Sequence, residues 1–92
     1  MSKTVVVVDD SKFLIKQIVD FFEKQLEFQV LGTGNDGNEA IELYKKFKPD
    51  LITLDITMPN KDGMDALKEI IKDFPGANIL MISAVRGSAM LE

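Results

Sequence analysis

The sequence contains no cysteine, no histidine and no tryptophan among its 92 residues. Without cysteine there are no disulfides and no thiolate metal sites, and without histidine there is no imidazole acid–base chemistry and no histidine-ligated metal. The chain also lacks a surplus of basic residues, because 11 lysines and arginines stand against 15 aspartates and glutamates, for a net charge of −4. Such a chain is a poor nucleic-acid binder, since phosphate contacts require a clustered basic face.

Long apolar runs are missing as well, and none approaches the length that crosses a membrane. The first residues lead directly into an expected strand rather than into a signal peptide. We therefore expect a cytoplasmic protein with no membrane partner. With 92 residues, 46% of them hydrophobic, the chain predicts one small domain, residues 1–92, with its own core. A domain of this size is marginally stable unless its packing is good or a partner contributes.

Strand and helix patterns alternate along the chain and predict an α/β fold. We expect strands at residues 3–8, 28–33, 51–55 and 78–83. The first contains four consecutive valines, which is typical of a strand buried on both faces of a parallel sheet. We expect helices from the cap at Ser11 to about Leu26, between the 34–37 loop and Pro49, at 64–74, and for one turn at 87–91. The βαβαβαβ order implies right-handed crossovers and a parallel sheet covered on both faces.

The first expected helix carries a stripe of apolar residues, which are Phe13, Leu14, Ile18, Phe21, Phe22 and Leu26. Their spacing is typical of a helix that buries one face. We therefore expect Phe21 and Phe22 to belong to the core rather than to a binding patch.

Polar side chains follow the carboxyl ends of the expected strands. Asp9 and Asp10 follow the first strand, Asp55 ends the third, and Ser83 ends the fourth. Ligands of open parallel sheets bind beyond these strand ends, near the change in strand order. If the first and third strands are neighbours, the four residues meet at one edge. Crowded carboxylates raise one another's pKa, and a hard divalent cation such as Mg²⁺ removes that penalty.

This pattern predicts a cation-binding phosphoacceptor pocket. We expect Asp10 and Asp55 to bind Mg²⁺ directly, Asp9 to bind it directly or through water, and the backbone carbonyl of Thr57 to add an oxygen. The carboxylate of Asp55 can attack phosphorus, and Ser83 can donate a hydrogen bond to the phosphoryl oxygens.

Each of these residues also has a simpler interpretation. An Asp-Asp-Ser run before a helix is commonly a capping cluster, and a lone carboxylate or serine in a loop says little. The combination with the turn-rich 58–63 loop is what favours a site.

Taken together, these motifs resemble the receiver domain of bacterial response regulators, and most closely the single-domain chemotaxis regulators of the CheY type. The resemblance covers essentially the whole chain and rests on four segments, which are Val7-Val8-Asp9-Asp10-Ser11, Leu54-Asp55-Ile56-Thr57-Met58-Pro59, Asp62-Gly63 and Ile82-Ser83-Ala84. It implies a flavodoxin-like three-layer fold, for which CheY is an established example of the strand order 2-1-3-4-5. Here the order would be 2-1-3-4, without the fifth strand and last helix.

The resemblance also implies roles for individual residues. Asp55 would be the phosphoacceptor, and the Mg²⁺ ligands would be Asp9, Asp10, Asp55 and the carbonyl of Thr57. Ser83 would be the hydroxyl that turns toward the phosphoryl group, and Ala84 the small residue that leaves room for it. The donor would be a histidine kinase or a small phosphodonor. The chain would not be an enzyme, apart from phosphorylating and dephosphorylating itself.

A complete receiver continues through a strand that carries a lysine and an aromatic switch residue, and this sequence ends before both. Lys61 and Arg86 lie in other segments and cannot take the place of that lysine. One charge contact to the phosphoryl group would be missing, and such contacts are often worth a few kcal/mol. We therefore expect phosphorylation and switching to suffer more than cation binding.

With the order 2-1-3-4, the fourth strand would be an edge that carries apolar residues on both faces and no charge. Such an edge invites pairing with another chain, so we expect a homodimer or larger homo-oligomer through this strand rather than a poorly folded monomer. An alternative function is a self-assembling fragment of the receiver fold, natural or engineered, without phosphotransfer. A hydrolase with an aspartate nucleophile on a similar sheet is a third interpretation, but a second aspartate after the nucleophile and a suitable lysine are not recognisable.

Overall fold

The computed structural model describes residues 3–56, 58 and 60–82. Along this part of the chain, strands and helices alternate in the order β1 (Lys3–Val8), α1 (Lys12–Glu23), β2 (Phe28–Gly34), α2 (Gly37–Phe47), β3 (Leu51–Asp55), α3 (Gly63–Asp73) and β4 (Ile79–Ile82). The strands pair in parallel in the order β2-β1-β3-β4. The predicted α/β, flavodoxin-like class and strand order are confirmed. The helical turn expected at 87–91 lies outside the described residues.

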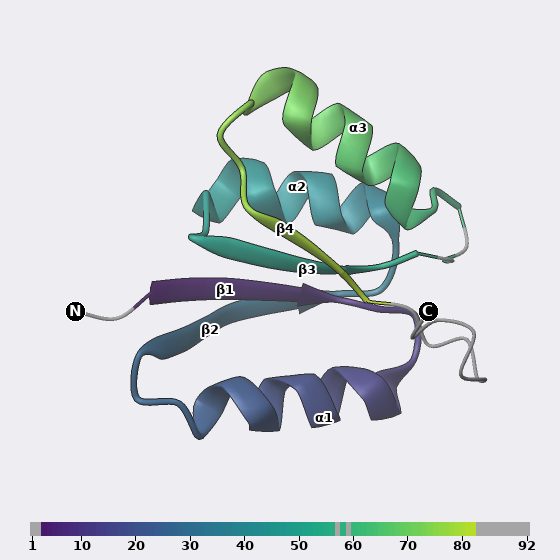
Figure 1. Cartoon of the computed structure of the whole chain (residues 1–92). Helices are drawn as coiled ribbons and strands as arrows, with labels where there is room; N and C mark the ends of the chain where they lie inside the picture. Colours follow the sequence, from purple (N-terminus) through teal and green to yellow (C-terminus); the bar gives the residue numbers. More distant parts are fainter. Residues whose placement is uncertain (1–2, 57, 59, 83–92) are drawn as a thin grey trace, which may run out of the picture.

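The sheet is the middle of three layers. Figure 1 shows α1 on one face and α2 and α3 on the other. The four valines of β1 are buried, and they alternate between two clusters. Val5 and Val7 pack with Phe22 of α1, whereas Val6 and Val8 pack on the side of α2 and α3, with residues such as Tyr44 and Ile70. Successive side chains of a strand point to opposite faces, so an all-valine strand suits a position between two helical layers.

The first helix is shorter than predicted and buries a narrower stripe. Ser11 caps it, because its hydroxyl accepts a hydrogen bond from the backbone N–H of Leu14 at 3.2 Å. The helix ends at Glu23, and Leu26, which was expected inside it, is 96% exposed in the turn to β2. That turn brings Phe28 against Phe22, with ring centroids 5.0 Å apart, so the chain has to leave the helix early.

Phe22 is a core residue as predicted, but Phe13 and Phe21 are 68% and 59% exposed. The prediction that Phe21 belongs to the core is therefore wrong within this chain. A helix that lies on one sheet face buries one side only, and here the residues packed on that face include Ile15, Ile18 and Val19.

Two aspartates cap the helices that cover the other face, and a third, Asp50, binds the start of β1. Asp36 accepts a hydrogen bond from Glu39 N and Asp62 accepts one from Asp65 N, both at 2.9 Å, so α2 and α3 start at Gly37 and Gly63. The 34–37 loop was predicted too long, because β2 extends to Gly34. At the opposite end of the sheet, Asp50 accepts from Thr4 N at 2.7 Å.

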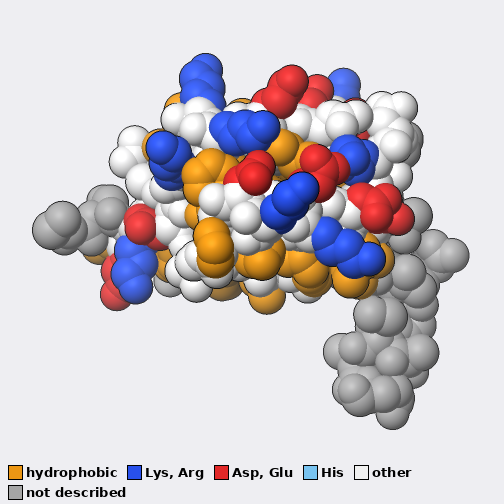
Figure 2. All heavy atoms as spheres, turned by 90° about the horizontal axis from the view of Figure 1, so that it is seen from above, with side chains coloured by type: hydrophobic (Ala, Val, Ile, Leu, Met, Phe, Trp, Pro, Cys, Tyr) orange, Lys and Arg blue, Asp and Glu red, His pale blue; other side chains and the backbone are white. Residues whose placement is uncertain are grey.

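Seen from the side of α3 and α2, the outer surface carries interspersed basic and acidic side chains rather than a patch of one sign (Figure 2). Among the described residues, no helix has both the length and the apolar character needed to cross a membrane.

Candidate metal and phosphoacceptor site

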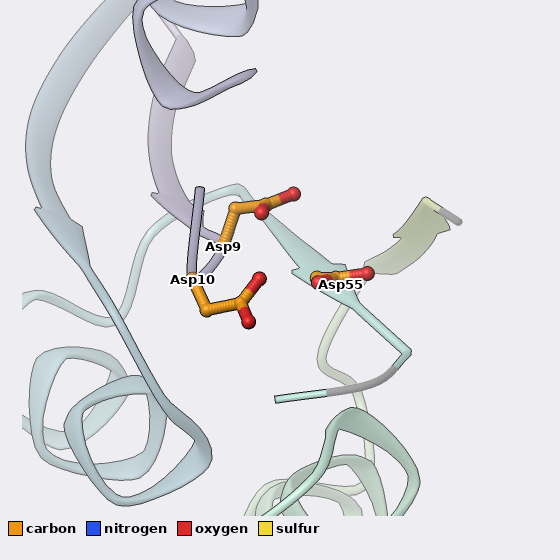
Figure 3. A group of neighbouring side chains, drawn as sticks. All are labelled: Asp9, Asp10 and Asp55. Carbon is orange, nitrogen blue, oxygen red and sulfur yellow. The ribbon is translucent and has the colours of Figure 1, made fainter. Parts of the chain in front are cut away.

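The pairing of the strands brings the acidic residues together. In the register of the sheet, Val8 of β1 lies opposite Leu54 of β3. Asp9 continues the line of β1, where its N–H donates to the carbonyl of Gly34 at 3.1 Å, and Asp55 is the last residue of β3. Figure 3 shows Asp9 and Asp10 on the segment after β1, facing Asp55 at the end of β3.

The three carboxylates form a compact group. Each offers an oxygen, and these oxygens lie within 4.8 Å of one another. Asp9 is 1% exposed and Asp55 4%, whereas Asp10 is open to solvent. The group therefore has two buried walls and one open side, through which a solvated ion or a phosphodonor can reach it.

The buried carboxylate of Asp9 is only partly hydrogen-bonded among the described residues. Its Oδ1 accepts a hydrogen bond from Ser11 N at 2.8 Å, but its Oδ2 is buried without a hydrogen-bond partner in the part of the chain that the structure describes. Burial raises the pKa of the Asp9 carboxyl, and the nearby charge of Asp10 raises it further, against the lowering effect of the Ser11 N–H. A buried carboxylate oxygen without a partner is costly, and a cation removes that cost.

The donor set fits Mg²⁺. It consists of carboxylate oxygens, which are the ligands that hard divalent cations prefer, and the open side leaves room for the waters that Mg²⁺ usually keeps. The Oδ2 of Asp9, which has no hydrogen-bond partner among the described residues, is an acceptor that a bound cation would satisfy.

A tight backbone contact fixes Asp55 from behind. Gly63 N donates to the carbonyl of Ile56 at 2.8 Å, and a Cβ on Gly63 would lie 2.0 Å from the carbonyl oxygen of Asp55. The first residue of α3 must therefore be glycine for this helix to sit against the end of β3. From the sequence, Asp62-Gly63 indicated a turn and a segment of the receiver motif, but not this contact with the backbone of Asp55.

The other predicted site residues are not all placed. Thr57, Ser83 and Ala84 lie outside the described residues. Lys61 is described, and its ammonium group forms an ion pair with Glu69 of α3. Asp36 and Gly37 at the start of α2 contact the loop after Asp55 through Asn60 and Lys61, and the sequence patterns did not predict these contacts.

The fold and the acidic group together define a flavodoxin-like α/β protein with a cluster of three carboxylates at the carboxyl ends of its central strands. A family model described as the response regulator receiver domain matches residues 5–92, and the chain belongs to this family. The family predicted from the motifs is thus confirmed.

Individual relatives agree with this assignment. The chain is 44% identical over 91 residues to the chemotaxis protein CheY of Thermotoga maritima, which covers 99% of this chain and 75% of that protein. It superimposes with a TM-score of 0.87 and 40% identity on the response regulator domain of Thermotoga maritima CheB, over 99% of this chain and 69% of that one. The TM-score is 0.86 and the identity 38% for a chain of the CheX–CheY–BeF₃–Mg²⁺ complex from Borrelia burgdorferi, over 96% of this chain and 66% of that one.

Proposed function

We propose that this chain is a receiver module that binds Mg²⁺ through Asp9, Asp10 and Asp55 and accepts a phosphoryl group on Asp55. The observation that carries the proposal is the convergence of three carboxylates within 4.8 Å, one of them with a buried oxygen that has no hydrogen-bond partner among the described residues. The related complex from Borrelia burgdorferi contains both Mg²⁺ and BeF₃, which supports the same use of the site here.

In the proposed reaction, a carboxylate oxygen of Asp55 attacks phosphorus. The new O–P bond forms while the bond from phosphorus to the donor's nitrogen or oxygen breaks, and the electron pair of that bond leaves with the donor. Bound Mg²⁺ would supply positive charge that offsets the repulsion between the phosphoryl oxygens and the carboxylates. Asp10, on the open side, and Asp9, on the buried side, would hold the ion together with Asp55.

Three further roles rest on the resemblance to the family alone. The carbonyl of Thr57 would be an additional metal ligand, the hydroxyl of Ser83 would donate to a phosphoryl oxygen, and Ala84 would leave space beside it. The donor would be a histidine kinase or a small phosphodonor, and the chain would catalyse nothing beyond its own phosphorylation and dephosphorylation. The expected location of such a module is the cytoplasm.

Intact-protein mass spectrometry tests the proposal. Incubation with acetyl phosphate and Mg²⁺ should add the mass of one phosphoryl group, and chelation of Mg²⁺ or the substitution Asp55→Asn should abolish the addition. Asp73→Asn, at an exposed carboxylate at the end of α3, is the matched control and should be modified like the wild type. A wild-type chain that gains no mass, under conditions that modify a full-length CheY, would refute phosphotransfer.

Self-association is a second proposal, favoured by the exposed side of β4. Among the described residues, β4 pairs with β3 only, so its other edge has free backbone groups. An open groove of about 320 Å³ lies beside it, lined mainly by Ile18, Phe21 and Phe22 of α1 and by Leu80 and Ile82 of β4. Leu80 is 47% exposed. We infer that a second copy of the chain pairs with this edge and covers the groove.

A further inference from the structure

The loop between Asp55 and α3 is tied to the start of another helix, α2. The side-chain amide of Asn60 donates to Oδ2 of Asp36 at 2.7 Å, and the backbone N–H of Gly37 donates to the carbonyl of Lys61 at 2.8 Å. At its base, the same loop is closed by the bond from Gly63 N to the carbonyl of Ile56. The described residues of this loop are thus fixed at both ends and near the tip.

The carboxylate of Asp36 binds both the start of α2 and the loop after Asp55. Its Oδ1 caps α2 by accepting from Glu39 N, while its Oδ2 accepts from Asn60. The N–H of Glu39, and after it the amide of Asn60, hold the pKa of Asp36 below its ordinary value, so the carboxylate is charged when it makes both contacts. A charged acceptor makes a stronger hydrogen bond than a neutral one.

The backbone on both sides of this contact leaves little freedom. Asn60 has φ 67°, in the left-handed region that asparagine tolerates better than most residues. A Cβ on Gly37 would lie 2.3 Å from the carbonyl oxygen of Lys61, so the backbones of the loop and of the helix start are too close together for any side chain at position 37. The pair Asp36–Asn60 therefore lies at a contact where few other backbone conformations are possible.

We propose that Asp36 and Asn60 are positioning residues that hold the loop following Asp55 and thereby set the Mg²⁺ affinity and the phosphorylation rate of the acidic site. The inference rests on the proposed function of that site. Ile56 directly follows Asp55, so a loop that shifts on α2 changes the direction in which the Asp55 carboxylate is presented. Residues that orient metal ligands typically contribute 10–100-fold to affinity or activity.

A charge swap tests the proposal. Asn60→Asp keeps the size of the side chain and a residue type that tolerates positive φ, but it places two carboxylates in contact. We expect Mg²⁺ affinity, measured by calorimetric titration, and the rate of modification by acetyl phosphate at saturating Mg²⁺ each to fall by about tenfold. In the double variant Asp36→Asn/Asn60→Asp, the amide and the carboxylate change places. Asparagine also caps helices, so both quantities should return to within about twofold of the wild type.

Thr4→Val is the control for a general loss of stability. It removes the hydroxyl that accepts from Asp50 N at 2.9 Å, at the opposite end of the sheet, and should lower the melting temperature with Mg²⁺ affinity unchanged. If Asn60→Asp lowers only the melting temperature, or if the double variant is not rescued, the positioning role is wrong while the proposed function stands. If the wild type itself neither binds Mg²⁺ nor is modified, the proposed function fails first.

Discussion

Asp9 is a residue of the acidic site whose buried charge destabilises the metal-free protein. Its carboxylate is buried, one of its oxygens lacks a hydrogen-bond partner among the described residues, and Asp10 adds a like charge beside it. Because folding raises the pKa of Asp9, the folded state holds the proton more tightly than the unfolded state. Protonation of Asp9 therefore adds to the free energy of unfolding. This contribution is fully present below the unfolded-state pKa of Asp9 and is lost as the pH rises through its raised folded-state pKa.

Asp9→Asn should therefore stabilise the metal-free protein at neutral pH, by about 1 kcal/mol, because it removes a buried charge and keeps the acceptor for Ser11 N. Thermal melts in a chelator at a series of pH values check this. The wild type should lose stability relative to Asp9→Asn as the pH rises, and the two should converge at acidic pH. Equal pH dependence of the two proteins would contradict the account of Asp9.

Added Mg²⁺ should reverse that order. A ligand that binds only the folded state raises the melting temperature, and the wild type has the complete set of carboxylates. We expect millimolar Mg²⁺ to raise the melting temperature of the wild type and to have a much smaller effect on Asp9→Asn. A shift of the same size in both proteins would show that Asp9 is not part of the ion's site.

At the scale of elements, local patterns predicted most of the architecture. Consecutive valines identified β1, and Pro49 correctly separated α2 from β3. Convergence of Asp9, Asp10 and Asp55 also followed, because parallel strands end at a common edge. The end of α1 did not follow, since it depends on the contact between Phe22 and Phe28 rather than on helical spacing. The pair Asp36–Asn60 spans 24 positions, and no periodicity links two such residues.

The packing of α3 on β3 gives a prediction at this scale. Gly63→Ala places a methyl group 2.0 Å from the Asp55 carbonyl oxygen, and both atoms belong to backbone that cannot move freely. We expect a loss of about 2–3 kcal/mol in the free energy of unfolding, together with weaker Mg²⁺ binding.

Gly76→Ala is the matched control, because a Cβ there meets nothing within 4 Å. It should be neutral or stabilise by up to about 1 kcal/mol. Chemical denaturation of the two variants separates these outcomes. Similar stabilities for Gly63→Ala and the wild type would mean that α3 does not press against the acidic site as described.

At the scale of the whole molecule, the two faces of the sheet are covered unequally. α2 and α3 cover one face, whereas among the described residues α1 alone lies on the other (Figure 1). The groove next to β4 is lined by residues of α1 and β4. Local patterns could predict the apolar strand β4, which the structure places at Ile79–Ile82, but could not show which of its side chains stay exposed. The exposure of these side chains depends on which residues from other elements pack against β4.

Leu80→Lys should therefore shift the protein toward monomer, because the substitution places a charge on the edge proposed to pair between copies. Leu26→Lys, at a residue that is 96% exposed in a turn away from that edge, should leave the association unchanged. Sedimentation equilibrium over a range of micromolar concentrations measures both. A wild type that remains monomeric throughout this range would contradict the proposed self-association.

The central claim is that three carboxylates at the end of the sheet hold a cation so that one of them, Asp55, takes a phosphoryl group. The most direct measurement is the location of that group after treatment with acetyl phosphate and Mg²⁺, with borohydride reduction of the acyl phosphate and mass mapping of the peptides. The account predicts a single reduced residue, Asp55, and none when Mg²⁺ is chelated. Modification at another aspartate, or equal modification of Asp55 without the metal, would contradict it.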